Sequence, residues 1–254
     1  MDLENKVAIV TGSSSGVGAA TVELLASKGC NVVINFSRSD AAAQLVAEQC
    51  RAIGVKALVC QADVADDNAC RQLVEQTLAQ LGRIDILVNN AGTTRFVAHQ
   101  DLQGLDKDDF FQIYGVNVVG PYQMIRAAEA ALRLSGNACV VNVASVAGVR
   151  GSGSSIAYAA SKGALLTMTQ SLARVMGPEV RVNAVCPGFI QGAWLEQGMG
   201  SDRYQMVKQT LENTAPLKLT CSAQSVAESI LNFIDGHSVV TGQYLVLDGG
   251  QSLI

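Results

Sequence analysis

Histidine is the scarcest reactive residue in this chain of 254 residues, which contains only His99 and His237. Two imidazoles leave no room for a His-rich metal site and argue against a Ser-His-Asp triad. The seven cysteines form no Cys-x-x-Cys pair and mostly fall in apolar stretches, as reduced core thiols do. We therefore expect no metal site, and we expect acid-base chemistry to fall to other side chains.

Strong charge and long apolar runs are also lacking. The formal net charge is -4 and only 16% of the residues are charged, which argues against nucleic-acid binding. The stretch 138–149 is apolar, but Asn142 and Ser145 interrupt it and it is too short to cross a bilayer. Residues 1–6 lead into a strand-like segment without an apolar signal region. We expect a soluble, cytoplasmic protein with neither nucleic-acid nor membrane partners.

Short β-branched runs alternate with segments of helical periodicity along the whole chain. The strand candidates are residues 7–11, 31–36, 56–61, 84–89, 138–143, 180–185 and 244–247. The helix candidates are residues 16–28, 39–53, 66–81, 106–134, 157–177 and 222–235. The strands are apolar almost throughout, as they are when helices cover both faces of a parallel sheet. We expect one doubly wound α/β domain over residues 1–254, with a seven-stranded parallel sheet.

The segment 188–216 departs from this compact pattern, because Gly192, Gly198 and Gly200 surround Trp194. Such a segment fits a mobile lid over a substrate. It fits equally an ordinary surface loop with a short helix.

A glycine-rich loop, Thr-Gly-Ser-Ser-Ser-Gly-Val-Gly at residues 11–18, follows the first strand and opens the first helix. Glycines let the backbone turn sharply and approach a pyrophosphate, while the helix N-terminus offers unpaired N–H donors. The spacing differs from Gly-x-Gly-x-x-Gly, and the Gly-Lys-Ser/Thr ending of a P-loop is missing. The loop predicts dinucleotide binding.

The end of the second strand indicates which dinucleotide is preferred. A carboxylate there would bind a ribose 2'-hydroxyl, but Ser37 and Arg38 offer a hydroxyl and a guanidinium suited to a 2'-phosphate. NADP is favoured, with NAD as the alternative. The competing interpretation is that Arg38 points into solvent.

Two further segments lie at predicted carboxyl ends of strands, where open α/β sheets bind ligands. They are Asp63-Val64 and Asn-Asn-Ala-Gly at residues 89–92. Asp63 could accept a hydrogen bond from an adenine amino group. A loop residue beside a helix start, and ordinary turn chemistry, are the alternatives.

Tyr158 and Lys162 stand one helical turn apart, so the phenol and the ammonium would project from one face, where the cation favours the phenolate. The alternative is two neighbours on a solvated helix. Ser145 ends a strand, which also fits a turn serine. Asn117 and the nearby Gly120 predict a helix irregularity that frees a carbonyl or holds a water, or Asn117 is merely tolerated.

These motifs follow one another in a single order. They are Thr-Gly-x-x-x-Gly-x-Gly at 11–18, Asn-Asn-Ala-Gly at 89–92, Asn117, Ser145, Tyr-x-x-x-Lys at 158–162 and Pro187-Gly188. Together they cover essentially the whole chain and resemble the short-chain dehydrogenase/reductase family, most closely its 3-oxoacyl-[acyl-carrier-protein] reductases. The resemblance implies a Rossmann fold and a catalytic tetrad of Asn117, Ser145, Tyr158 and Lys162.

The same resemblance implies a set of cofactor-binding residues. They are Gly12, Ser14, Ser15, Gly16, Val17, Gly18, Ser37, Arg38, Asp63, Val64, Asn90, Ala91, Gly92, Tyr158, Lys162, Pro187, Gly188 and Ile190.

The activity implied is NADP-dependent transfer of a hydride between nicotinamide and a carbonyl or secondary alcohol, in a 3-oxoacyl thioester or another small ketone. By the resemblance, Ser145 would bind the carbonyl oxygen and Tyr158 would donate the proton. Lys162 would lower the pKa of Tyr158 and hold ribose hydroxyls, and Asn117 would anchor a water. The alternatives are a sugar, steroid or quinone-type dehydrogenase, and a non-catalytic NADP-binding regulator or scaffold.

The sequence departs from the reductase pattern at several places. Ser15 stands where many NADP-dependent relatives have Arg, and Gly192 stands where Thr is frequent. Residues 218–221 replace a usual Gly-Arg run. We expect pocket walls at 96–100 and 191–209. The resemblance also implies a homo-oligomer, a tetramer or a dimer, built on helices 106–134 and 157–177 and on residues 245–254.

Overall fold

The computed structural model describes residues 1–236 and 238–253. In this part of the chain, seven parallel strands form one sheet in the order β3-β2-β1-β4-β5-β6-β7. They are β1 (Val7–Val10), β2 (Asn31–Phe36), β3 (Ala57–Gln61), β4 (Ile86–Asn89), β5 (Ala138–Val143), β6 (Val180–Pro187) and β7 (Tyr244–Leu247). The expected seven-stranded, doubly wound α/β domain is confirmed.

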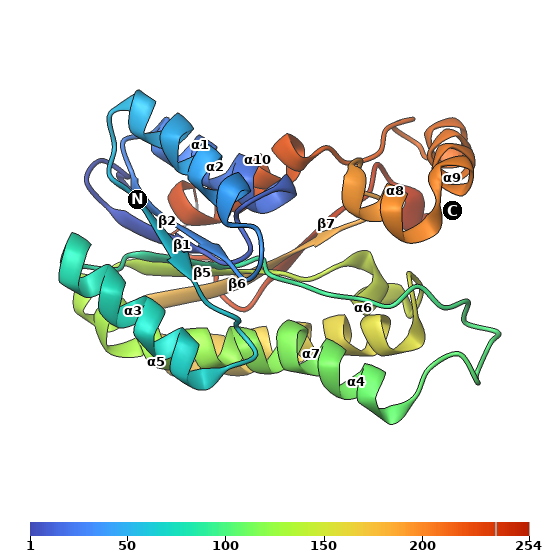
Figure 1. Cartoon of the computed structure of the whole chain (residues 1–254), viewed down its shortest axis with the longest axis horizontal. Coiled ribbons are helices and arrows are strands. Elements are labelled where there is room, and N and C mark those ends of the chain that lie inside the picture. The colour runs from blue at the N-terminus through green and yellow to red at the C-terminus, as the bar shows by residue number, and fades with distance from the viewer. Residues whose placement is uncertain (237, 254) are drawn as a thin grey trace.

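Helices cover both faces of the sheet (Figure 1). On one face lie α1 (Gly16–Ala26), α2 (Asp40–Ile53) and α10 (Ala223–Asp235), and on the other lie α3 (Asp67–Leu81), α5 (Gly120–Ser135) and α7 (Ile156–Met176). Local chemistry sets the ends of these helices. The Asp66 carboxylate, for example, accepts hydrogen bonds from the first turn of α3, and Gly82 ends that helix in the left-handed conformation.

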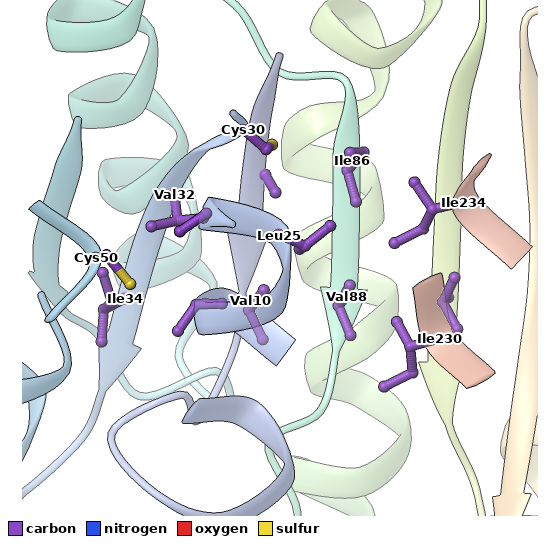
Figure 2. Packing of buried hydrophobic residues seen from close by; sticks show 14 of the residues in the cluster. Val10, Leu25, Cys30, Val32, Ile34, Cys50, Ile86, Val88, Ile230 and Ile234 are labelled. Carbon is purple, nitrogen blue, oxygen red and sulfur yellow. The ribbon is translucent and has the colours of Figure 1, made fainter. Parts of the chain in front are cut away.

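Each face of the sheet has its own apolar core. Figure 2 shows the cluster beneath α1 and α10, where strand residues meet helix residues that are fully buried. The labelled side chains include Val10, Val32, Ile34, Ile86 and Val88 from strands, Leu25 from α1, and Ile230 and Ile234 from α10. Burying one such side chain contributes about 1.5–3 kcal/mol. Both faces of the inner strands are covered, which explains why these strands are apolar almost throughout.

The winding of the sheet reverses at β1, which pairs with β2 on one side and with β4 on the other. The crevice outside the carboxyl ends of these strands is where doubly wound sheets bind ligands. The glycine loop follows β1, and the Asn-Asn-Ala-Gly motif ends β4. The topology therefore places both motifs at the same switch point.

The single helix expected over 106–134 is wrong in detail. It is divided into α4 (Lys107–Tyr114), a π-helical turn (Gly115–Val119) and α5. Asn117 lies inside the π-turn, so the predicted irregularity at that residue is present. Its side-chain amide is hydrogen-bonded to the backbone of Thr93, on the loop after β4.

Three further helices differ from the sequence-based expectation. The segment 188–216 is mostly helical, with α8 (Ala193–Met199) and α9 (Ser201–Thr214). The five-residue helix α6 (Val146–Arg150), which the periodicity does not predict, lies between β5 and α7. Figure 1 shows α6, α8 and α9 at one end of the molecule.

No helix among the described residues is long and apolar enough to cross a membrane. Within residues 1–236 and 238–253, no group of three or more His, Cys, Asp or Glu side chains is arranged to hold a metal ion.

Candidate active site

The glycine loop is shaped by two positions that exclude side chains. Gly12 has a φ of +61°, and a Cβ there would lie 2.9 Å from the Cα of Ala91. A Cβ on Gly18 would lie 2.5 Å from the carbonyl oxygen of Gly12. The backbone of the loop is thus packed so closely against its neighbours that only glycine fits.

Polar side chains hold this loop in place. The Asn90 amide donates to the carbonyl oxygens of Thr11 (2.9 Å) and Gly12 (3.0 Å), while the Thr11 hydroxyl accepts from the backbone N–H groups of Asn90 and Ala91. On the other side, Asn35 Oδ1 accepts from the Gly12 N–H at 3.1 Å. The Asn90 side chain therefore supports the loop from behind.

The start of α1 fits the pyrophosphate of a dinucleotide. Its N-cap, Ser15, makes no side-chain capping hydrogen bond, and the first turn contains no acidic residue. The N–H groups and the positive end of the helix dipole therefore remain available to an anion. With the glycine cradle beside it, this donor set suits NAD or NADP.

The residues expected to read the adenosine half are exposed at the ends of β2 and β3. Arg38 makes no ion pair or side-chain hydrogen bond within the described residues, so its guanidinium is free for a ligand. Ser37 is exposed, and its backbone carbonyl accepts from the Gln61 amide at 3.0 Å. Asp63 is exposed, but one carboxylate oxygen accepts from the Ala65 N–H at 3.0 Å. Asp63 is thus a loop residue before α3, and its role toward an adenine stays a prediction.

Val64 lies beneath the exposed residues at the ends of β2 and β3, not among them. The side chain is buried, and its carbonyl accepts from the Gln123 amide at 2.8 Å. A Cβ on Gly120 would lie 2.8 Å from Val64 Cγ2, so Gly120 allows α5 to approach the loop closely.

Ser145 begins α6 as its N-cap. Its Oγ accepts from the Ala147 N–H at 3.1 Å and donates to the Pro187 carbonyl at 3.3 Å. The hydroxyl is fixed between β5 and β6 at the carboxyl edge of the sheet. The α6 helix packs directly on α7, since a Cβ on Gly148 would lie 2.5 Å from the Lys162 backbone.

Lys162 is buried, with only 3% of its surface exposed. Its ammonium donates to the Val143 carbonyl at 2.7 Å and lies 5.7 Å from the centroid of the Tyr158 ring. The alternative of two neighbours on a solvated helix face is therefore wrong.

Burial dominates the acid-base properties of this pair. It raises the pKa of Tyr158 to about 12, a shift that a hydrogen bond with Ser145 opposes. Burial also lowers the pKa of Lys162 to about 8. Burial therefore determines the pKa of the phenol in this structure, and the expected lowering of that pKa by Lys162 stays a prediction.

Asn117 joins the site to the loop after β4. Its Oδ1 accepts from the Thr93 N–H at 2.8 Å, and its Nδ2 donates to the Thr93 carbonyl and to the Ser161 hydroxyl, both at 3.0 Å. A Cβ on Gly92 would lie 3.5 Å from Asn117 Oδ1 and 3.6 Å from Lys162 Nζ. Gly92 therefore leaves open the space between these two side chains.

The structure thus brings Asn117, Ser145, Tyr158 and Lys162 to the carboxyl edge of the sheet, at the same edge as the glycine loop expected to bind a dinucleotide. A family model described as short chain dehydrogenase matches residues 6–202. The chain belongs to the short-chain dehydrogenase family.

Two relatives and one solved structure show the same relationship. This dehydrogenase is 41% identical over 251 residues to "Granaticin polyketide synthase putative ketoacyl reductase 2" of Streptomyces violaceoruber, covering 99% of this chain and 98% of the relative. It is 34% identical over 252 residues to 3-oxoacyl-[acyl-carrier-protein] reductase FabG of Thermotoga maritima, covering 98% and 99%. The crystal structure of NAD⁺-bound xylitol dehydrogenase superposes with a TM-score of 0.89 at 27% identity, covering 98% and 100%. The protein is an oxidoreductase of a family that binds NAD or NADP.

The expected lid, residues 188–216 of the dehydrogenase, lies against the phenol, and its role as a lid stays a prediction. The Trp194 ring on α8 has its centroid 6.3 Å from that of Tyr158 and 6.0 Å from that of Phe96. The expected walls at 96–100 and 191–209 therefore meet beside Tyr158.

The rear of the site is closed by the last strand. The Gly188 N–H donates to the Leu247 carbonyl at 2.7 Å, and a Cβ on Gly188 would lie 2.8 Å from Asp248 Cβ. Ile190 forms a β-bridge with Cys221. These contacts fix the backbone of residues 187–190 at the rear of the site.

Sequence reasoning missed two residues that organise the cofactor cradle, Thr11 and Asn35. Asn35 is buried at the end of β2, and its Nδ2 donates to the carbonyls of Cys60 (3.3 Å) and Ala62 (3.0 Å). A polar residue near the end of an otherwise apolar strand was the available signal.

Proposed function

We propose that this dehydrogenase is an NADP-dependent carbonyl reductase, acting on a 3-oxoacyl compound or another ketone. The observation that carries the proposal is the placement of a hydroxyl, a phenol and a buried amine, from Ser145, Tyr158 and Lys162, at the carboxyl edge of the sheet. The names of two relatives, a ketoacyl reductase and a 3-oxoacyl-[acyl-carrier-protein] reductase, support this substrate class.

Each of these residues has its own role in the reduction. Ser145 donates a hydrogen bond to the substrate carbonyl oxygen, and Tyr158 protonates that oxygen as negative charge develops. A pKa near 12 keeps the phenol protonated at neutral pH, as a proton donor requires. Lys162, whose ammonium lies 5.7 Å from the centroid of the Tyr158 ring, supplies positive charge beside the phenol, and Asn117 fixes the backbone at Thr93. When bound, the nicotinamide supplies the hydride.

Arg38 supports the preference for NADP over NAD. Its unpartnered guanidinium lies one residue beyond Ser37 at the end of β2, where the ribose of an adenosine is read. We expect Arg38→Ala to raise KM for NADPH by about 10-fold or more while changing KM for NADH little. Arg71→Ala, at a surface arginine paired with Asp67, is the matched control. Equal losses for both cofactors would reject this role.

We further propose that the enzyme is a cytoplasmic homo-oligomer, a tetramer or a dimer. Phe111, Val119 and Tyr122 are exposed along α4 to α5, and Tyr244 and Leu245 are exposed on β7, which gives candidate contact surfaces. The expected contact segment 245–254 is described only to residue 253, and Ile254 lies outside the described residues.

The function is tested with a carbonyl panel read by NADPH and NADH absorbance. The panel holds acetoacetyl-coenzyme A, cyclic ketones, a sugar, a steroid and a quinone. We expect NADPH to be consumed with at least one ketone. If the protein binds NADPH but no panel member oxidises it, the non-catalytic regulator or scaffold becomes the better proposal.

A further inference from the structure

We propose that the rings of Phe96 and Trp194, here called the aromatic wall, select ketones that are carried on a flat, apolar ring system. This inference rests on the proposed carbonyl reductase function and narrows its substrate class. It concerns the binding surface beside Tyr158 and not the proton transfer.

The aromatic wall stands directly beside the phenol. Trp194 makes an edge-on contact with Phe96, at an interplanar angle of 61°, and a tilted contact with Tyr158, at 49°. Both centroid distances fall in the range of interacting aromatic pairs. Trp194 nevertheless keeps 51% of its surface exposed. About half of the indole surface beside the Tyr158 ring is therefore not covered by the protein.

The wall is held rigidly. A Cβ on Gly198 would lie 1.9 Å from a ring carbon of Phe96, so the phenyl ring rests on the backbone of α8 itself. The Val97 N–H donates to the Ser154 carbonyl at 2.8 Å, and the Gly192 N–H donates to the Tyr204 hydroxyl at 3.1 Å. These contacts fix the loop that carries Phe96 and the start of the lid. A surface fixed in advance loses little entropy when a ligand docks.

The chemistry near the wall favours an uncharged, planar ligand. The neighbouring cations Arg95 and Arg150 are engaged, by Asp109 and by the Gln251 carbonyl. Gly153 puts no side chain beside the phenol, where a Cβ would lie 3.7 Å from the Tyr158 ring. A flexible chain gains only apolar contact from such a wall. A flat ring gains stacking in addition, a difference of about 3- to 10-fold in affinity.

Binding can be followed without turnover, because Trp194 is the only tryptophan of the chain. The wild-type enzyme, saturated with oxidised NADP, is titrated with 2-tetralone and with 2-decanone, a straight-chain ketone of equal carbon number. We expect 2-tetralone to change the Trp194 emission and to bind about 3-fold or more tightly than 2-decanone. Equal affinities, or no change in emission, would overturn the proposal.

Turnover by variants then tests whether the Trp194 ring causes the preference for 2-tetralone. We expect Trp194→Ala to lower kcat/KM for 2-tetralone about 10-fold more than for 2-decanone, and Trp194→Phe to restore most of the difference. Met206→Ala, at an exposed residue of the same lid, is the matched control. Equal losses for both ketones in Trp194→Ala would reject the aromatic wall while leaving the reductase function intact. If wild type reduces neither ketone nor any panel member, the proposed function fails, and the fluorescence titration still decides the wall.

Discussion

Buried charged side chains have opposite surroundings at the two edges of the sheet. At the amino edge, the fully buried Asp85 accepts hydrogen bonds from Arg83, Ser135 and the Val7 N–H, and Lys6 lies 3.6 Å away. These partners outweigh desolvation and hold the pKa of Asp85 below its ordinary value.

At the carboxyl edge, the buried Lys162 has a carbonyl as its hydrogen-bond acceptor and no carboxylate partner among the described residues. Desolvation prevails there, and the pKa of the amine falls to about 8. A buried charge that has all its hydrogen-bond and ion-pair partners stabilises the fold. A buried charge that lacks an opposite charge lowers the free energy of unfolding and can exchange protons. The buried charge at the amino edge therefore contributes to stability, and we expect the chemistry at the carboxyl edge.

The largest effect should come from the carboxyl edge. We expect Tyr158→Phe to lower kcat by about 10²- to 10⁴-fold, because only the proton donor is lost. The melting temperature and NADPH affinity, measured by calorimetry, should stay near those of wild type. Near-normal turnover would show that another group donates the proton.

The amino edge should show the reverse pattern. We expect Asp85→Ala to lower the free energy of unfolding by about 3–5 kcal/mol, since it strips a buried network of its acceptor. The milder Asp85→Asn provides a folded comparison, with kcat unchanged. Because the folded pKa of Asp85 is depressed, its stabilisation is present above the ordinary value of 3.8 and is lost as the pH falls through the lower folded value. Urea unfolding between pH 7 and pH 3, compared with the variant, measures this; a variant as stable as wild type contradicts it.

Lys162 gives a second test of the difference between the two edges, because replacing this residue should stabilise the protein. We expect Lys162→Met to raise the free energy of unfolding at neutral pH by about 1–3 kcal/mol while abolishing turnover. The unfolded chain keeps the proton up to about pH 10.5, whereas the folded amine loses it near pH 8. Wild-type stability should therefore rise relative to the variant between these two values. Urea unfolding without added cofactor tests this, and a variant less stable at neutral pH would refute it.

The smallest effect concerns the lid beyond the carboxyl edge. Gly198→Ala should destabilise the lid by about 1–3 kcal/mol, because the new Cβ meets the Phe96 ring. In a Phe96→Ala background the same change should be neutral or stabilising by about 0.5 kcal/mol, as helix propensity dictates. Thermal melts followed by Trp194 emission give the coupling, and additive effects would contradict the contact.

Much of the fold could be predicted from the sequence, because apolar strands and glycine turns are local signals. The seven strands and the irregularity at Asn117 were found in this way. The α6 helix was not, since five residues carry too little periodicity. The roles of Asn35 and Thr11, and the sign of the Tyr158 pKa shift, depend on burial by segments distant in sequence. Spacing places the phenol beside the amine but says nothing about how much water remains around them.

The closure of the site by β7 bears on how the enzyme is made. Ser145 bonds to Pro187, Gly188 rests on Leu247 and Asp248, and Arg150 at the end of α6 donates to the Gln251 carbonyl at 2.9 Å. During synthesis, residues 247–251 leave the ribosome after residues 145–188. A nascent chain can therefore form its glycine loop early, but Gly188 and Arg150 gain these partners only after residues 247–251 have been added.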